Sequence, residues 1–247
     1  KDDFSIDDLQ ISTKTINLKD LVLLARSIKN SPQLFILDNI IKGGIVVGDI
    51  NLNFDNKGKI KKDYEIKGFI KDAKLDIFKK HSIDYLNLIF NINNKSYNLK
   101  DIEGNFDQIN LSLPIVNIIE KKNSFLFNGK LISKKNNIEV KLLNKVFDDN
   151  FKKFNVDEVD FTSDSDFTFL LNKRLKVTDL KLKSLIELNK LVYRNNLSNI
   201  KKYLPNFKDS IDLENHQISI NYQKDKIQVS GKGKIKIQNK VDKIDYE

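Results

Sequence analysis

The sequence contains no cysteine, methionine or tryptophan, and only three prolines and nine glycines among 247 residues. The absence of cysteine excludes disulfide bonds and thiolate metal sites. No apolar run approaches the ~18 residues that a transmembrane helix needs, and no signal peptide is recognisable. Because the chain does not begin with methionine, we expect a piece of a longer protein, whose membrane anchor, if it has one, lies outside this segment.

Arginine is scarce among the basic residues. The chain has 43 lysines and arginines against 34 acidic residues, a net charge of +9 and a pI near 9.3. The basic residues are mostly lysines spread singly along the chain. Arginine binds phosphates and base edges more specifically than lysine, because its guanidinium group forms bidentate hydrogen bonds. We therefore predict no nucleic-acid partner and attribute much of the charge to an AT-rich genome.

Alternation of apolar and polar residues is the dominant pattern, and it predicts strands with one apolar face. Turn sequences such as Asp55–Gly58 and Asn93–Ser96 separate successive runs, which favours antiparallel meanders. The predicted fold is mainly β: a long curved antiparallel meander sheet that forms an open apolar groove, with two or three short helices. Glycines inside the strands indicate either bulges and tight bends or deliberate curvature of the sheet.

Three breaks in the alternation predict turns. Tyr64–Ile77 predicts a hairpin that turns at Lys71-Asp72, where the apolar positions change from even to odd numbers. "KKNN" at Lys134–Asn137 and the polar "DFTSDSD" at residues 160–166 predict two further turns.

The chain is predicted to have three parts: a helical and strand cap over residues 1–42, a first β-meander unit over 43–145, and a second over 156–247 that continues the same sheet. In the cap, Asn17 is the expected N-cap of a helix over Leu18–Asn30. A second helix is expected over Pro32–Ile41 and another over Leu197–Leu204. With few cations on its polar face, the first helix is predicted to cap the end of the groove rather than to bind a membrane.

No catalytic or metal-binding pattern stands out. His81 and His216 are far apart in the sequence and in turn-like contexts, so both are predicted to lie on the surface. "GKGK" at Gly231–Lys234 lies inside an alternating run with no helix after it, which excludes a phosphate-binding loop. We predict no enzymatic activity, no catalytic residue, no metal and no cofactor.

The repeated pattern of alternating runs resembles the AsmA-like superfamily of Gram-negative envelope proteins, which includes the YhdP and TamB types. The pattern is glycine, alternating apolar residues, Asp-Ala, and a second alternating run, as in Gly68, Ile70, Asp72-Ala73, Leu75 and Ile77. A looser copy starts at Gly104, and "SLIELNKLVY" and "VSGKGKIKI" repeat the rhythm. The resemblance implies a groove segment, in the periplasm, of a parent protein that is anchored in the inner membrane and meets components of both membranes.

The resemblance also implies a function: binding or conducting phospholipid between inner and outer membranes in support of outer-membrane lipid homeostasis. The partners would be the acyl chains, which would meet the predicted groove lining: Val46, Ile50, Phe54, Tyr64, Ile66, Ile70, Leu75, Ile77, Leu88, Phe90, Leu111, Phe127, Leu131, Val140, Phe169, Val177, Ile220, Val229 and Ile235. The alternative is a structural or interaction β-sandwich, whose second sheet would pack on the same residues and leave no channel.

Overall fold

The computed structural model describes residues 7–28, 31–77, 80–107, 109–139, 156–174, 176–194, 203, 210–237 and 240–247. Two predicted features, the connector over Leu143–Asn155 and the helix over Leu197–Leu204, lie outside the described residues.

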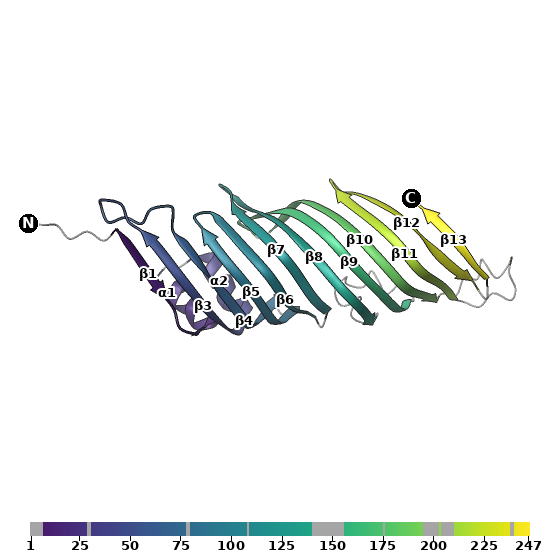
Figure 1. The fold of residues 1–247 in the computed structure, drawn as a ribbon, viewed down its shortest axis with the longest axis horizontal. Helices are drawn as coiled ribbons and strands as arrows, with labels where there is room; N and C mark the ends of the chain where they lie inside the picture. Colours follow the sequence, from purple (N-terminus) through teal and green to yellow (C-terminus); the bar gives the residue numbers. More distant parts are fainter. Residues whose placement is uncertain are drawn as a thin grey trace, which may run out of the picture. The chain divides into compact units, whose positions relative to one another are not determined.

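In the described part of the chain, thirteen strands form one antiparallel sheet that does not close on itself (Figure 1). From β3 onward each strand lies beside the strand that follows it in sequence, β1 pairs with β3 at the other end, and β2 also pairs with β3. This order confirms the predicted mainly β, antiparallel meander. The strands are β1 (Asp8–Ser12), β2 (Ile16–Asn17), β3 (Ile41–Asn53), β4 (Glu65–Ile77), β5 (His81–Asn93), β6 (Ser96–Phe106), β7 (Ile109–Glu120), β8 (Ser124–Glu139), β9 (Val156–Asn172), β10 (Val177–Arg194), β11 (Ser210–Gln223), β12 (Lys226–Ile237) and β13 (Lys240–Tyr246).

Two short helices, α1 (Leu18–Ile28) and α2 (Pro32–Ile40), contact β3, and α2 also contacts β4. Asn17 caps α1 as predicted, because its side-chain oxygen accepts the N–H of Lys19 at 2.9 Å. Ser31 caps α2 through the N–H of Leu34 at 3.3 Å. No helix among the described residues has the length and apolarity to cross a membrane.

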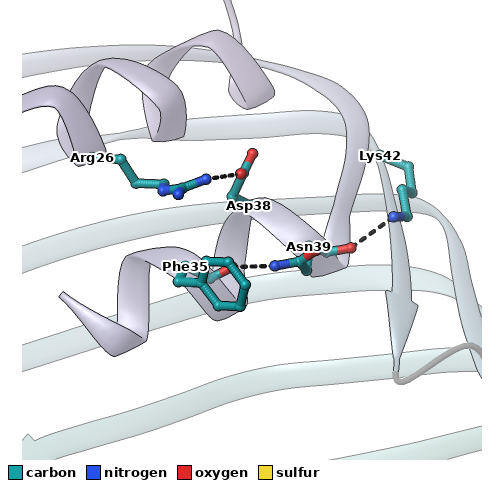
Figure 2. Close-up of polar contacts among 5 residues, drawn as sticks. All are labelled: Arg26, Phe35, Asp38, Asn39 and Lys42. Carbon is teal, nitrogen blue, oxygen red and sulfur yellow. Dashed lines mark hydrogen bonds and ion pairs between the residues drawn. The ribbon is translucent and has the colours of Figure 1, made fainter. Parts of the chain in front are cut away.

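Polar contacts hold the two helices together (Figure 2). Arg26 of α1 forms an ion pair with Asp38 of α2, and its guanidinium carbon lies 5.3 Å from the centre of the Phe35 ring. The Asn39 side chain donates to the carbonyl of Phe35 at 2.8 Å, and the Lys42 ammonium donates to the carbonyl of Asn39 at 2.7 Å. The two helices therefore form one packed hairpin.

A line of β-bulges crosses four neighbouring strands. Non-glycine residues take positive φ at Asp72 in β4 (51°), Tyr85 in β5 (55°) and Asp101 in β6 (49°), and Gly44 does so in β3 (115°). The strand registers shift at or next to each of these positions. A bulge adds one residue and bends the strand, so bulges in consecutive strands bend this part of the sheet along one line.

The three turns predicted from breaks in the alternation are wrong. Tyr64–Ile77 contains one strand, β4, and Asp72 is its bulge rather than a hairpin turn. Residues 134–137 continue β8, and residues 160–166 lie within β9. By contrast, the turn at Asp55–Gly58 is confirmed, since the N–H of Gly58 donates to the carbonyl of Asp55 at 2.8 Å.

The chain forms two compact units. Unit 1 contains Lys1–Asp107, Leu111–Gly129 and Phe169–Thr178, and unit 2 contains Gln108–Asn110, Lys130–Thr168 and Asp179–Glu247.

Candidate ligand-binding surface: the apolar face of the sheet

Aliphatic side chains line up across the strands of unit 1. Directly paired residues of neighbouring strands lie on the same face of a sheet, so the register fixes which side chains are neighbours. The rows across β3, β4, β5 and β6 are Val46–Ile70–Leu88, Ile50–Ile66–Ile92–Tyr97 and Ile41–Leu75–Ile83–Phe106. We call this surface the apolar face of unit 1.

The burial of this face is greatest beside the bulges. Val46, Ala73, Leu86 and Ile102, one from each of four consecutive strands, are between 0 and 9 % exposed. Farther from the bulges, Ile50, Ile66 and their neighbours are only half-buried. The helices contribute to this burial, since α2 runs directly into β3 and contacts both β3 and β4.

An aromatic ring fills the space over two paired glycines in this face. Gly48 pairs with Gly68, and Gly68 pairs with Phe90. A Cβ atom on Gly68 would lie 2.9 Å from Phe90 Cζ and 2.1 Å from the carbonyl oxygen of Val47. The Phe90 ring therefore packs directly against the backbone of these two glycines.

Unit 2 has a comparable surface on β10, β11 and β12. The paired rows are Leu182–Tyr222–Ile227, Ser184–Ile220–Val229 and Leu191–Leu213–Ile235. At the end of this surface Ile227 is 65 % exposed and Val229 is 37 % exposed. We call it the apolar face of unit 2.

Polar groups on this second surface are paired. The hydroxyls of Ser165 and Ser184 lie 2.7 Å apart and are buried. The His216 ring lies against Gly233 and contacts the carbonyl oxygen of Lys234 at 2.9 Å and the Tyr246 hydroxyl at 3.3 Å. Tyr246 in turn covers Gly231, and burial raises the pKa of its hydroxyl.

Both histidine predictions are wrong. His216 is 2 % exposed. The His81 side chain is only 18 % exposed, and its Nδ1 lies 2.5 Å from the buried carboxylate of Asp107. Each histidine is therefore a packed and partnered residue. His81 ties the start of β5 to Asp107, which follows β6 and also accepts the N–H of Ser82 at 3.0 Å. His216 lies within β11 and contacts β12.

Hollows cross the strands of unit 2. One of about 840 Å³ spans β10 to β13 between Leu185 and Glu247, and one of about 600 Å³ adjoins it. A third, of about 480 Å³, spans β8 to β10. These volumes are in the range of ligand sites. Their linings include charged residues such as Glu187 and Lys232, so the hollows are not purely apolar.

Most residues predicted to line the groove come together within their own unit. In unit 1 the register places on one face Val46, Ile50, Ile66, Ile70, Leu75, Ile77, Leu88 and Phe90. In unit 2 it does so for Ile220, Val229 and, three alternations farther along β12, Ile235. Phe127 and Phe169 stack with ring centroids 4.7 Å apart.

The remaining predicted residues are not members of the paired rows described above. Phe54 lies just beyond β3, bridged to Ile60, and the Tyr64 hydroxyl donates to the carbonyl of Asn94 at 2.6 Å. Leu111 and Leu131 are half-buried in β7 and β8. Val177, at the start of β10, is 48 % exposed. Val140 lies outside the described residues.

Sequence reasoning missed several members of these faces, including Ile83, Ile92, Leu99, Leu182 and Ile218. The sequence does contain a signal for a bulge: the apolar positions of a strand change between odd and even numbers there. In β5, for example, the apolar positions are odd up to Ile83 and even from Leu86 onward, because Tyr85 is the extra residue.

The Tyr97 side chain belongs to the apolar face of unit 1, in the row with Ile66 and Ile92. Burial raises the pKa of the Tyr97 hydroxyl, and the negative charge of Glu120 adds to the effect. The opposite face holds Lys67, Lys71 and Lys74 of β4 together with exposed Phe69 and Ile89, which pair with each other.

Within the described ranges, no group of three or more histidine, cysteine or acidic side chains could hold a metal ion. Comparisons with protein-family models, curated proteins and solved structures gave no match. The geometry of the sheet is therefore the basis for the functional argument.

Proposed function

We propose that this chain binds the acyl chains of phospholipid on its apolar faces and is one segment of a β-groove that conducts phospholipid between membranes. The observation behind the proposal is the register of unit 1: rows of apolar side chains cross three or four consecutive strands, and many of these side chains remain half-exposed. In the described part of the chain every strand belongs to a single sheet, so no second sheet is present there to cover these rows.

The energetics suit an acyl chain. Each buried methylene contributes about 0.8 kcal/mol, so binding strength accumulates along the chain without a specific polar contact. Neighbouring rows have similar aliphatic side chains. The binding free energy of an acyl chain therefore stays nearly constant as the lipid moves from one row to the next. Exposed lysines on the strands would meet the phosphate as point charges.

The cellular setting is part of the same proposal. The periplasmic location, the inner-membrane anchor of a longer parent and the contribution to outer-membrane lipid homeostasis rest on the resemblance to AsmA-like proteins. What the chain contributes in their favour is a single open antiparallel sheet among its described residues.

The test compares two adjacent positions of β4. Ile70 lies in an apolar row, whereas Phe69 points to the opposite face and is 43 % exposed. We expect native mass spectrometry of the purified chain to detect co-purified phospholipid, which Ile70→Asp removes and Phe69→Asp retains. Phe127→Asp should act like Ile70→Asp. Equal lipid content in folded Ile70→Asp and Phe69→Asp would refute the proposal.

A further inference from the structure

Two tyrosines lie at one end of the apolar face of unit 1, where four strands begin or finish. Tyr97, near the start of β6, belongs to the row that contains Ile66. Tyr64 is two residues before Ile66, so its side chain lies on the same face. The Tyr64 hydroxyl donates to the carbonyl of Asn94, in the turn between β5 and β6, at 2.6 Å. The polar ends of both tyrosines therefore lie at the rim of an apolar surface.

Glu120, the last residue of β7, lies at the same rim. Its backbone N–H donates to the carbonyl of Lys95, in the turn that also holds Asn94, at 2.8 Å. Burial raises the pKa of the Tyr97 hydroxyl, and the negative charge of Glu120 and the neighbouring Tyr64 add to the effect. The carboxylate and the two hydroxyls therefore converge. We call Tyr64, Tyr97 and Glu120 the rim cluster.

The carboxylate of Glu120 is half-buried and has no partner of opposite charge. Among the described residues it takes part in no ion pair, and neither it nor the Tyr97 hydroxyl forms a side-chain hydrogen bond. Glu65, at the same end of the sheet but on the opposite face, differs: it accepts the Asn91 amide at 2.9 Å and lies 4.0 Å from Lys67. A carboxylate that has lost part of its hydration gains most from a cationic hydrogen-bond donor.

The groups of the rim cluster are hydrogen-bond acceptors. The proton of the Tyr64 hydroxyl is donated to Asn94, which leaves its oxygen free to accept, and the Tyr97 oxygen and the Glu120 carboxylate also accept. A primary ammonium carries three N–H donors and one positive charge, which matches this set. A quaternary ammonium has no N–H and binds to the faces of aromatic rings, whereas here the hydroxyls converge.

Lysines next to the rim cluster complement the other charge of a zwitterion. Lys95 and Lys121 are exposed, and each is joined by the backbone to Glu120, one by a hydrogen bond and one by the peptide bond. In a phosphoethanolamine group a phosphate lies two carbons from the ammonium. The phosphate would meet these lysines as point charges while the ammonium meets the acceptors.

We propose that the rim cluster binds the primary ammonium of an ethanolamine headgroup while the acyl chain lies along the apolar face of unit 1. This inference rests on the proposed function, because burial of the acyl chain supplies most of the affinity. The rim cluster adds a preference among lipids that have the same acyl chain.

The test is calorimetry with three single-chain phospholipids below their micelle concentrations, alike in the acyl chain and carrying ethanolamine, choline or glycerol. We expect the ethanolamine lipid to bind the full chain about tenfold more tightly than the other two, which is the size of effect expected from charge-assisted hydrogen bonds. Glu120→Gln should reduce this preference to about twofold or less, because it removes the charge and keeps the shape. Glu65→Gln is the matched control and should retain the full preference.

Tyr97→Phe provides a second test that keeps the buried ring and removes one acceptor. It should reduce the preference to about threefold. Thermal unfolding establishes that each variant is folded. A preference that is unchanged in both folded Glu120→Gln and folded Tyr97→Phe would overturn the inference, and so would a loss of preference in Glu65→Gln equal to that in Glu120→Gln.

Failure of this inference and failure of the proposed function give different results. Ile70→Asp should weaken binding of all three lipids by a similar factor, since it disturbs the surface that holds the acyl chain. Equal affinity of the unmodified chain for all three lipids, or a preference for glycerol, would overturn the ethanolamine inference alone. Absence of binding for all three would overturn the proposed function and this inference with it.

Discussion

At the residue scale, Gly68 shows how closely the strands of unit 1 approach each other. A Cβ there would lie 2.1 Å from the carbonyl oxygen of Val47 and 2.7 Å from the Cα of Gly48. Backbone atoms cannot give way as a flexible side chain can, so we expect Gly68→Ala to lower the free energy of unfolding by about 2 kcal/mol or more. Urea denaturation measures this. Gly43→Ala is the control, since nothing lies within 4 Å of its Cβ position; a similar loss in both variants would contradict the packing argument.

The buried carboxylate of Asp107 is a second residue with a defined role. It contacts His81 at 2.5 Å and the N–H of Ser82 at 3.0 Å, at a backbone φ of 47°. Asp107→Ala leaves a buried donor without its acceptor and places alanine in the left-handed region, so a loss of about 3 kcal/mol is expected. Asp107→Asn retains an acceptor and tolerates that φ, and its loss should be clearly smaller. Thermal unfolding of both variants checks this order.

At the element scale, the bulges determine which side chains lie on the apolar face of unit 1. Asp72 is the extra residue that keeps Ile70 and Ala73 on the same face of β4. Deleting Asp72 would place Ala73 two positions after Ile70 and remove the bulge, while the bulges at Gly44 in β3 and Tyr85 in β5 would remain. The pairing of β4 with both neighbours would then slip by one residue on one side of the deletion. We expect the deletion to cost about 4 kcal/mol or more, whereas Asp72→Gly, which suits a φ of 51°, should be near neutral. A deletion variant as stable as the unmodified chain would mean that the bulge does not set the register.

Elements that depend on short-range hydrogen bonds could be predicted from the sequence, whereas bulges could not. Asn17 and the Asp55–Gly58 turn depend on short-range hydrogen bonds, and both were predictable. A bulge and a hairpin both interrupt the alternation with polar residues, and only pairing to a neighbouring strand distinguishes them. The hairpin at Lys71-Asp72 was therefore predicted where one strand continues.

The apolar faces were predictable in part for the same reason. Residues in an unbroken alternating run, such as Ile66 and Ile70, were assigned correctly. Ile83, which the Tyr85 bulge separates from the run over Leu86–Ile92, was missed. The burial of His216 could not be inferred, because it depends on Gly233 of the next strand leaving room for the ring.

At the scale of the whole molecule, the proposed function depends on repetition rather than on one site. Both units repeat the same arrangement, with aliphatic rows across paired strands and aromatic rings over strand glycines. A surface of this kind distinguishes ligands by the apolar area they bury and has few groups with which to recognise a headgroup.

That property leads to a prediction about lipid structure. For single-chain phospholipids, calorimetry with the full chain should show affinity rising about tenfold for every two added methylenes, since each contributes about 0.8 kcal/mol. Exchanging a choline for a glycerol headgroup should change the affinity little at moderate salt, because the lysines are exposed and screened. An enclosed pocket of fixed length behaves differently: affinity reaches a maximum at one chain length and falls beyond it. A maximum of that kind, or strong selection between choline and glycerol, would mean that the acyl chain is not lying along an open apolar surface.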